Sequence, residues 1–272
     1  MSAPSCVILY VRKHENVHSG FMHLQRDRDG RRVAVFSVTW KGRKLHRPMN
    51  TRERTIQSYH LREYDAGRAA GWYEMPVIRR CGAAPERLVG FNEILTAKAD
   101  RAAGVHFYLD DYQFERIWKT PARYIPILAR FSCVLTPDFS LYMDMPRAMK
   151  IWNVYRSRLI GQMMQDAGIS VIPSLSWAEP ESYDFCFDGI EPGGTVSVST
   201  VGVMRDEAAA DIWRAGFAEA VKRLRPSCVI LYGKEIRGMD YAGRVIHIRN
   251  EVTARMKERA GHGRTRRIER NE

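Results

Sequence analysis

The strongest pattern of hydrophobic and polar positions lies in residues 131–177, which we expect to form a strand, a helix and a second strand. Apolar runs at 133–135 and 169–175 flank an amphipathic stretch over 145–167. The two runs are short and almost wholly apolar, which is typical of parallel strands buried on both faces. The pattern therefore predicts a βαβ unit at the centre of the chain.

The expected helix carries signals along its length and at both ends. Asp144 can cap its start, Pro146 suits its first turn, and Gly168 suits the left-handed residue that ends it. Side chains at spacings of three and four residues define its buried face. They are Met149, Trp152, Tyr155, Arg156, Leu159, Ile160, Met163 and Met164.

The same alternation continues on both sides of this unit. We expect strands at 105–109, 133–135, 169–175, 195–201 and 229–232, and helices at 85–102, 112–118, 121–131 and 207–225. Successive parallel strands with helical crossovers form either a barrel or a doubly wound sheet. The predicted fold class is α/β, with a partial or irregular (β/α) barrel favoured over a doubly wound sheet.

The N-terminal part differs in pattern from this core. Residues 4–12 indicate a strand, and residues 21–40 indicate a β-hairpin around Asp27-Arg28-Asp29-Gly30. The segment Pro4–Tyr10 recurs identically as Pro226–Tyr232, without a longer repeat around it. We predict a basic N-terminal hairpin segment over 1–73, an α/β core over 74–260 and a basic flexible tail over 261–272.

Basic charge is concentrated at the two ends of the chain. The net charge is +12, of which residues 1–80 carry +9, residues 81–243 carry −2 and residues 244–272 carry +5. Basic ends on a near-neutral core indicate a polyanion partner. Alternatively, the basic charge only keeps the protein soluble. The expected nucleic-acid contacts are Arg31, Arg32, Arg43, Lys44, Arg47, Arg264, Arg266 and Arg267.

The composition supports a hydrophobic core and gives no membrane signal. Hydrophobic residues make up 45% of the 272 residues, and no apolar run is long enough to span a bilayer. The five cysteines form no CxxC pair, and free thiols in a cytoplasmic protein explain them best. We expect nucleic acid as the main partner, a host or phage protein as the alternative, and no membrane.

Polar residues gather where the expected strands end, which is where parallel α/β folds place their sites. They are Asp110, Asp111, Asp138, Ser176, Trp177, Glu179, Ser199, Thr200, Lys234 and Glu235. Carboxylates in such a position suit Mg²⁺ or acid–base chemistry. The predicted catalytic set is Asp110, Asp111, Asp138, Arg156, Arg158, Trp177 and Glu179. Alternatively, Asp110 and Asp138 only cap helices and Arg156 only pairs with one of them.

Two further motifs have weaker support. His14-Glu15-x-x-His18 matches the HExxH pattern of zinc proteases, but it lacks the apolar helical flanks such a site needs. Cys186 has no histidine near it in the sequence, so the segment 182–188 is better explained by alternating buried side chains than as a nucleophile site.

Several motifs together resemble a known family. They are Asp110-Asp111-x-x-Phe114-x-x-Ile117-Trp118, Pro137-Asp138-Phe139-Ser140-x-Tyr142-x-Asp144-x-Pro146, Trp152-Asn153-x-Tyr155-Arg156-x-Arg158, Val171-Ile172-Pro173, Ser176-Trp177, Ser182-Tyr183-x-Phe185-Cys186-Phe187-Asp188-Gly189-Ile190 and Ser199-Thr200-x-Gly202. Over about residues 74–255 the chain resembles domain-of-unknown-function family 4417, found in phages, plasmids and other mobile elements. The resemblance implies a mobile-element setting and no established activity.

Two functional hypotheses follow. The first is an enzyme acting on nucleic acid or nucleotides, with the carboxylates as an acidic, metal-binding site and the basic ends holding the polyanion. The second is a non-catalytic binding or inhibitory protein that docks on nucleic acid or a host protein, in which the carboxylates are structural. A zinc protease built on His14, Glu15 and His18 is a remote third.

Overall fold

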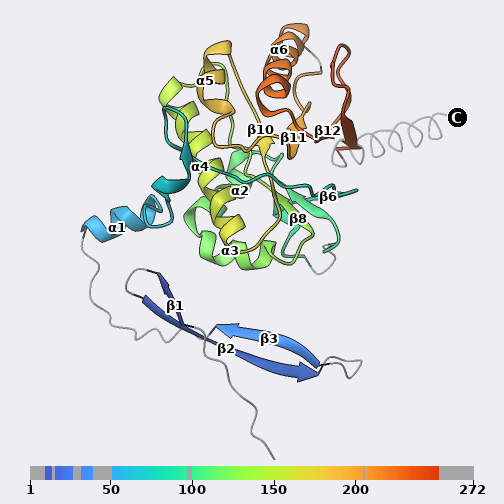
Figure 1. Ribbon diagram of the computed structural model, residues 1–272. Helices are drawn as coiled ribbons and strands as arrows, with labels where there is room; N and C mark the ends of the chain where they lie inside the picture. Colours follow the sequence, from blue (N-terminus) through green and yellow to red (C-terminus); the bar gives the residue numbers. More distant parts are fainter. Residues whose placement is uncertain are drawn as a thin grey trace, which may run out of the picture. The chain divides into compact units, whose positions relative to one another are not determined.

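The computed structural model describes residues 10–13, 16–26, 32–38, 51–96, 100–204 and 206–250 (Figure 1). The chain divides into two compact units, Met1–Glu53 and Arg54–Glu272. Residues 54–73, which the sequence groups with the N-terminal hairpin, lie in the second unit. The domain limits at residues 73 and 260 otherwise stay predictions.

The first unit contains the predicted hairpin. Strands β1 (Tyr10–Lys13), β2 (Asn16–Arg26) and β3 (Arg32–Val38) form an antiparallel sheet in that order. β2 pairs with β3 from Gly20↔Val38 to Arg26↔Arg32, which confirms the hairpin around the Asp-Gly turn sequence. Of the strand expected at 4–12, β1 covers the last three positions, and residues 4–9 lie outside the described residues.

The second unit follows the predicted alternation of strands and helices. Its helices are α1 (Thr51–Ser58), α2 (Asp111–Lys119), α3 (Pro121–Leu128), α4 (Arg147–Asp166), α5 (Tyr183–Cys186) and α6 (Glu207–Leu224), with short 3-10 turns at Ala66–Arg68, Phe91–Glu93 and Pro180–Ser182. Its strands are β4 (Ala69–Ala70), β5 (Met75–Pro76), β6 (Leu88–Gly90), β7 (Gly104–His106), β8 (Cys133–Leu135), β9 (Val171–Ile172), β10 (Ser174–Leu175), β11 (Thr195–Ser199), β12 (Cys228–Tyr232) and β13 (Arg244–Ile248). Each strand expected between 105 and 232 is present.

The strands of the core are parallel and lie in sequence order. One sheet has the order β6-β7-β8-β9 and the other β10-β11-β12-β13. Sequential order without a reversal is the arrangement of barrel-type folds, whereas a doubly wound sheet reverses at a switch point. The favoured α/β prediction is therefore confirmed. Among the described strands, none pairs with both β13 and β6, so the barrel stays open.

Pro173 joins the two sheets into one curved surface. Proline has no N–H to donate to a strand ladder. Side-chain hydrogen bonds continue the pairing beyond it: the Ser174 N–H donates to Thr136 Oγ1 at 2.9 Å, and the Ser174 hydroxyl donates to the Thr136 carbonyl at 2.8 Å. The Pro173 carbonyl accepts the Ser197 N–H at 2.9 Å. The chain thus passes from the edge of one sheet to the edge of the next within two residues.

The curvature brings distant strands together around a shared interior. In a flat sheet, β7 and β11 lie about 14 Å apart, at roughly 4.8 Å per strand. Instead, the hydroxyl of Tyr108, two residues beyond β7, donates to Ser197 Oγ on β11 at 2.7 Å. The rings of His106 on β7 and Tyr232 on β12 have centroids 4.6 Å apart. The interior is filled by Leu88, Cys133, Leu135, Ile172, Ile230, Tyr232 and Ile248.

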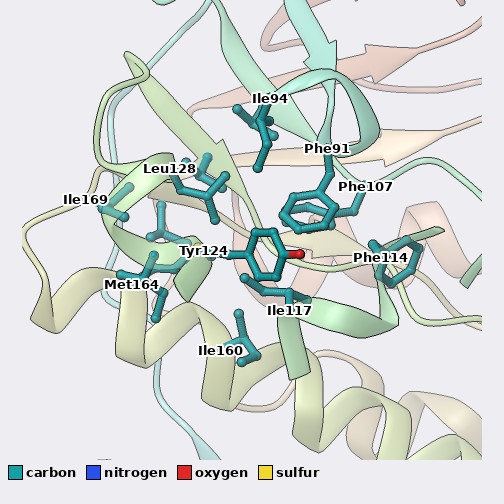
Figure 2. Close-up of a cluster of buried hydrophobic side chains, with 14 of the residues drawn as sticks. Phe91, Ile94, Phe107, Phe114, Ile117, Tyr124, Leu128, Ile160, Met164 and Ile169 are labelled. Carbon is teal, nitrogen blue, oxygen red and sulfur yellow. The ribbon is translucent and has the colours of Figure 1, made fainter. Parts of the chain in front are cut away.

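Helices cover the outer surface of the curved sheets. On β7–β9, the outward side chains Val105, Val134 and Val171 pack under α2, α3 and α4. Figure 2 shows this cluster, in which the Phe91 and Phe107 rings stack, Tyr124 is tilted against Phe91, and Ile160 and Met164 come from α4. A second cluster packs α5 and α6 against β10–β12. Because successive side chains of each strand point to opposite faces of the sheet, the apolar residues form one core inside the curve and another under the helices.

Helix α4 confirms the predicted central helix with one correction at its start. The residue before it is Pro146, no side chain caps it, and Asp144 is exposed, so the predicted Asp144 cap is wrong. The helix begins at Arg147, which leaves Asp144 too far upstream to reach its first free N–H groups. Gly168 has φ +81°, as expected for a helix end.

One other predicted element is wrong. The helix expected at 85–102 is instead β6 followed by a 3-10 turn; Leu88, Phe91 and Ile94 are all buried, because a strand and a three-residue turn give the same spacing as a helical face. Residues 180–186 form a 3-10 turn and α5, and Phe185, Cys186 and Phe187 are buried.

In the part of the chain that the structure describes, no helix combines the length and apolar character needed to cross a bilayer.

Candidate functional site

A pocket of about 630 Å³ opens at the carboxyl ends of the curved sheets. Segments that follow β7, β8, β10, β11 and β13 contribute to its wall, together with α6. Of the predicted site residues, Asp110, Asp138, Ser176, Trp177 and Ser199 line it. Five of the residues expected at the strand ends therefore lie around one cavity, and their roles stay predictions.

Asp138 is the pocket carboxyl with the most unusual surroundings. It follows β8, and its atom Oδ1 is buried without a hydrogen-bond partner. Burial raises the pKa of Asp138 to about 7, Asp111 raises it further, and the Ser176 hydroxyl and Arg158 oppose the rise. The Asp138 carboxyl is therefore able to take up and release a proton near neutral pH.

Asp110 lies at the rim and belongs to a chain of side-chain hydrogen bonds. The Gln113 amide donates to Asp110 Oδ2 at 3.3 Å, and the Asn92 amide donates to Gln113 Oε1 at 3.2 Å. Asp110 precedes α2 but makes no side-chain cap. The alternative that it only caps this helix is therefore not supported by its contacts.

Asp111 supports the pocket without lining it. Its carboxylate accepts the Ser140 hydroxyl at 2.8 Å and the Ser140 N–H at 3.2 Å. Asn153 of α4 donates to the Ser140 carbonyl at 2.7 Å. Every polar group of Ser140 is thus bound, which fixes the loop that carries Asp138 two residues earlier.

Arg156 stabilises the same loop, the one after β8, through its contacts with Phe139 and Asn153. Its Nη1 donates to both carboxylate oxygens of Glu115, at 3.0 and 2.9 Å, and its Nη2 donates to Asn153 at 2.7 Å. Its guanidinium lies 3.8 Å from the ring centroid of Phe139, which lines the pocket. Arg156 therefore pairs with Glu115, rather than with Asp110 or Asp138.

Glu179 forms an ion pair with Lys150, which is only 1% exposed. The same ammonium donates to the Met143 carbonyl at 3.2 Å. Met143 lies in the loop between β8 and α4, and Glu179 lies in the loop after β10. Lys150 therefore ties two pocket loops to the first turns of α4.

Arg158 does not line the pocket, although its charge acts on Asp138 and opposes the rise in the pKa of that carboxyl. It is buried and donates to the Cys186 carbonyl at 2.6 Å and the Asp188 carbonyl at 3.1 Å. Burial lowers its pKa to about 10. Its contacts fix the end of α5. Thr200, similarly, donates to the Lys234 carbonyl at 2.7 Å and joins the ends of β11 and β12.

Two tryptophans form a fixed aromatic wall. The Trp177 indole donates to the Ile212 carbonyl at 3.2 Å and packs against Gly216 of α6. The Trp213 indole donates to the Ser199 carbonyl at 2.9 Å and stacks on Phe217 with centroids 4.9 Å apart. Both indoles are therefore held in place by hydrogen bonds from their N–H groups to backbone carbonyls, and Trp213 is 5% exposed.

Sequence reasoning missed several lining residues. Tyr108, Asn92, Gln113, Trp213 and Asn250 all line the pocket. Tyr108 had a usable signal, since it lies beside the strand end at Leu109. Asn92 had none, because β6 is too short to produce a strand pattern. Burial raises the pKa of the Tyr108 hydroxyl, so this group stays protonated.

The acidic residues do not form a compact metal cluster. Within the described ranges, no three His, Cys, Asp or Glu side chains are grouped to hold a metal ion. Asp111 and Glu179 are already bound to Ser140 and Lys150. Mg²⁺ therefore stays a prediction that involves Asp110 and Asp138.

The remaining predicted contacts lie mostly outside the described residues. Arg32 begins β3, while Arg31, Arg43, Lys44, Arg47, Arg264, Arg266 and Arg267 are not described. In the HExxH motif, His14 and Glu15 are not described, and His18 lies in β2. His18 therefore lies in a strand, whereas the zinc-protease motif requires its second histidine on a helix.

Together, a sequential parallel α/β fold and a pocket at its carboxyl edge define a protein with the general layout of α/β ligand-binding and catalytic proteins. A family model described as "Domain of unknown function (DUF4417)" matches residues 68–249, and the chain belongs to this family. The family expected from the sequence motifs is thereby confirmed.

Two curated relatives are phage proteins, as the resemblance predicts. The "Gene 1 protein" of Mycobacterium phage D29 is 42% identical over 164 residues, which are 60% of this chain and 61% of the relative. The "Gene 1 protein" of Mycobacterium phage L5 is 40% identical over 166 residues, which are 60% of this chain and 72% of the relative. The chain thus spans less than two thirds of the D29 protein. No solved structure matches this chain.

Proposed function

We propose that this protein is a nucleic-acid-associated enzyme in which Asp138 exchanges a proton with a substrate bound in the pocket. The observation that carries the proposal is the Asp138 carboxyl, which lines the pocket with Oδ1 buried and unpartnered. Its pKa of about 7 suits general acid or base catalysis at neutral pH. Perturbed carboxyl groups in clefts are typical of functional sites.

The rigidity of the Asp138 loop supports the proposal. Asp111 and Asn153 hold Ser140, Lys150 holds the Met143 carbonyl, and Arg156 stacks on Phe139. These contacts come from α2 and α4 and hold one short loop. Such preorganisation lets a catalytic group act without reordering at each turnover.

Nucleic acid as the substrate class is supported by charge. The ends of the chain are basic, with +9 over residues 1–80 and +5 over 244–272, whereas the core that forms the pocket is near neutral. Basic ends would hold a polyanion by its phosphates, independently of the chemistry in the pocket. Mg²⁺ is a candidate cofactor, since it is often held by one or two carboxylates together with substrate oxygens.

The test uses the full chain with labelled single- and double-stranded DNA and RNA, in Mg²⁺ and in EDTA, across a salt series. We expect salt-dependent binding and turnover of at least one substrate. Asp138→Asn should lower turnover by about 100-fold or more with binding changed by less than about 3-fold. Asp144→Asn is the control, because Asp144 is exposed on the same loop and does not line the pocket.

Binding without turnover of any substrate overturns the enzyme proposal, and the absence of both overturns nucleic-acid association as well. Turnover that is lost in EDTA and restored by Mg²⁺ supports a metal at Asp110 and Asp138.

A second candidate, docking on a host or phage protein, is favoured by a different surface. Tyr59, Leu61, Tyr73, Trp152 and Tyr155 line a separate groove of about 420 Å³ over α4. Tyr59 and Leu61 are about half exposed. Exposed aromatic surface is typical of protein interfaces. Capture of one defined host protein by the wild type, and its loss in Tyr59→Ala with turnover unchanged, supports this candidate.

A further inference from the structure

The outward face of α2 carries two cationic side chains and an exposed aromatic ring. Tyr112, Arg116 and Lys119 follow one another at spacings of four and three residues, so they share the face opposite the buried side of the helix. Tyr112 is 80% exposed, Lys119 is exposed, and Arg116 is partly buried. Cations interleaved with an aromatic ring on one surface are typical of a nucleic-acid interface.

Aromatic rings hold two arginines of this surface in place. The Arg116 guanidinium lies 5.0 Å from the ring centroid of Phe91 and 5.6 Å from that of Tyr124. The guanidinium of Arg123, which comes from α3, lies 5.5 Å from the centroid of the same Tyr124 ring. An arginine stacked on a ring is positioned without using the N–H groups at the edge of its plane. The two guanidinium groups are therefore set beside each other in an arrangement that suits phosphate oxygens.

The positive charge of this surface is not compensated by carboxylates. Residues 112–130 contain four cationic residues and one acidic residue, Glu115. The Glu115 carboxylate is bound to Arg156 of α4. Among the described residues, no carboxylate forms an ion pair with any of the three cations on this surface. Like charges held side by side repel each other and attract a polyanion, which lowers the repulsion.

The cationic side chains adjoin the pocket. Gln113 lines the pocket, and Arg116 lies about one turn further along α2. Phe91, which holds the Arg116 guanidinium, directly precedes Asn92, which also lines the pocket. None of the described residues that line the pocket is Lys, Arg or His. The phosphates of a bound nucleic acid are therefore better matched to this face of α2 than to the cavity beside it.

We propose that the α2–α3 basic surface, formed by Tyr112, Arg116, Lys119 and Arg123, binds a single-stranded nucleic acid beside the pocket. The three cations contact the phosphates, and the Tyr112 ring stacks with a base. A single strand is favoured over a duplex because an exposed ring stacks on a base that is not already stacked in a helix. The inference rests on the proposed function in taking nucleic acid as the substrate class, and it adds a phosphate-binding surface within the core.

The test is fluorescence anisotropy of the full chain with labelled single-stranded DNA and RNA oligonucleotides, in EDTA and across a salt series. Lys119→Gln/Arg123→Gln should weaken binding by about 10-fold or more at low salt. It should also lower the slope of log K against log salt by about 1.4, because each phosphate contact with a single strand contributes about 0.7. Arg116 is left unchanged because it is partly buried. Thermal unfolding checks that the variant folds.

Arg79→Gln/Arg80→Gln is the matched control for net charge. Both side chains are exposed, and Arg80 packs beside Gly194, next to the first residue of β11 and so at the end of that strand opposite the pocket. This double variant removes the same charge and should change binding by less than about 3-fold.

Tyr112→Ala separates stacking from charge. It should weaken binding of the single strand by about 5-fold or more and leave the salt slope unchanged, because stacking on a base releases no counterions. Trp72→Ala removes another exposed ring, from the turn between β4 and β5, and should leave binding unchanged. A duplex of the same sequence should bind more weakly than the single strand.

Unchanged binding in Lys119→Gln/Arg123→Gln, or an equal loss in Arg79→Gln/Arg80→Gln, overturns the inference. Duplex binding as tight as single-strand binding also overturns it, as does equally tight binding of polyglutamate, which would indicate an acidic protein partner. Oligonucleotide turnover in Mg²⁺ together with unchanged binding in the Lys119 and Arg123 double variant overturns the inference and leaves the proposed function standing. Binding that this variant weakens, without turnover of any substrate, does the reverse.

Discussion

The carboxylate of Asp111 accepts both the hydroxyl and the backbone N–H of Ser140, at 2.8 and 3.2 Å. The two residues are 29 positions apart and belong to successive βα connections. This link holds the loop after β8 against the start of α2. It explains why the two neighbouring aspartates at 110 and 111 have different roles, one at the pocket and one behind it.

Breaking this link should loosen the loop. Asp111→Ala leaves the Ser140 N–H without its partner, so we expect a loss of about 1–3 kcal/mol in the free energy of unfolding. Ser140→Ala removes only the hydroxyl and should cost about 1 kcal/mol. Urea unfolding of both single variants and the double variant measures the coupling. Asp144→Ala is the control, and additive effects in the double variant would contradict a direct interaction.

Arg156 should not be replaceable by lysine. The Arg156 Nη1 donates to Glu115 and its Nη2 to Asn153 while the planar guanidinium lies over the Phe139 ring, and a single lysine ammonium cannot reproduce all three contacts. We expect Arg156→Lys to lower stability by about 1–3 kcal/mol in urea unfolding. Arg147→Lys is matched on the same helix, where its pair with Asp184 is largely exposed, and should change stability far less than Arg156→Lys does. Equal effects of the two variants would refute the assigned role of Arg156.

The Lys150–Glu179 pair should respond unequally to removal of its two members. Lys150 is buried, whereas Glu179 is about one quarter exposed. Glu179→Ala leaves a buried ammonium unpaired and should cost about 3 kcal/mol. Lys150→Met keeps the volume and removes the buried charge, so it should cost clearly less. Thermal and urea unfolding of both variants give the comparison, and the opposite ranking would show that the charge is not the controlling factor.

Gly216 should be essential for the position of Trp177. In a helix interior, Gly→Ala normally stabilises by about 1 kcal/mol. At Gly216 an added Cβ overlaps the Trp177 indole, so Gly216→Ala should destabilise the protein and change its near-ultraviolet circular dichroism. Ala218 lies on the exposed face of α6, so Ala218→Gly measures the difference in helix propensity between alanine and glycine without a packing effect. This substitution should cost about 1 kcal/mol in the free energy of unfolding. A stabilising effect of Gly216→Ala would refute the close contact.

Asp138 should make stability depend on pH. Its folded-state pKa of about 7 lies above the unfolded value of 3.8, so the folded state holds the extra proton between these values. Stability should therefore fall as pH rises from about 4 to 7 and stay low above that. Asp138→Asn removes this cost, and we expect it to raise the melting temperature at pH 8 by several degrees, on the order of 1–2 kcal/mol, and less at pH 5.

Thermal unfolding of wild type, Asp138→Asn and Asp144→Asn at pH 5 and pH 8 makes this comparison. Asp144 is exposed, so its variant should show no such difference. If Asp138→Asn has the same melting temperature as the wild type at pH 8, the Asp138 carboxyl is not buried in solution.

The sequence by itself determined the order and type of the main elements. Periodicity marked α4 and α6, short β-branched runs marked β8 and β11, and an Asp-Gly turn marked the hairpin of β2 and β3. These signals are local, because each depends on residues within one or two turns of the chain. Where the local signal was short or ambiguous, as at β6 and β13, only the pairing with a distant strand made the element visible.

Only the tertiary structure decided which contacts each of the site residues makes. The sequence placed Asp110, Asp111, Asp138 and Glu179 at one edge of the sheet and grouped them with Arg156 of the central helix in one catalytic set. Folding brought Asp138 to the pocket with an unpartnered oxygen, while Ser140 satisfied Asp111 and Lys150 satisfied Glu179. Hydrogen-bond partners lie 29 or more positions apart in these cases, and sheet curvature brings Tyr108 to Ser197 across 89 positions. Such pairings depend on strand order and curvature, which the pattern along the chain does not encode locally.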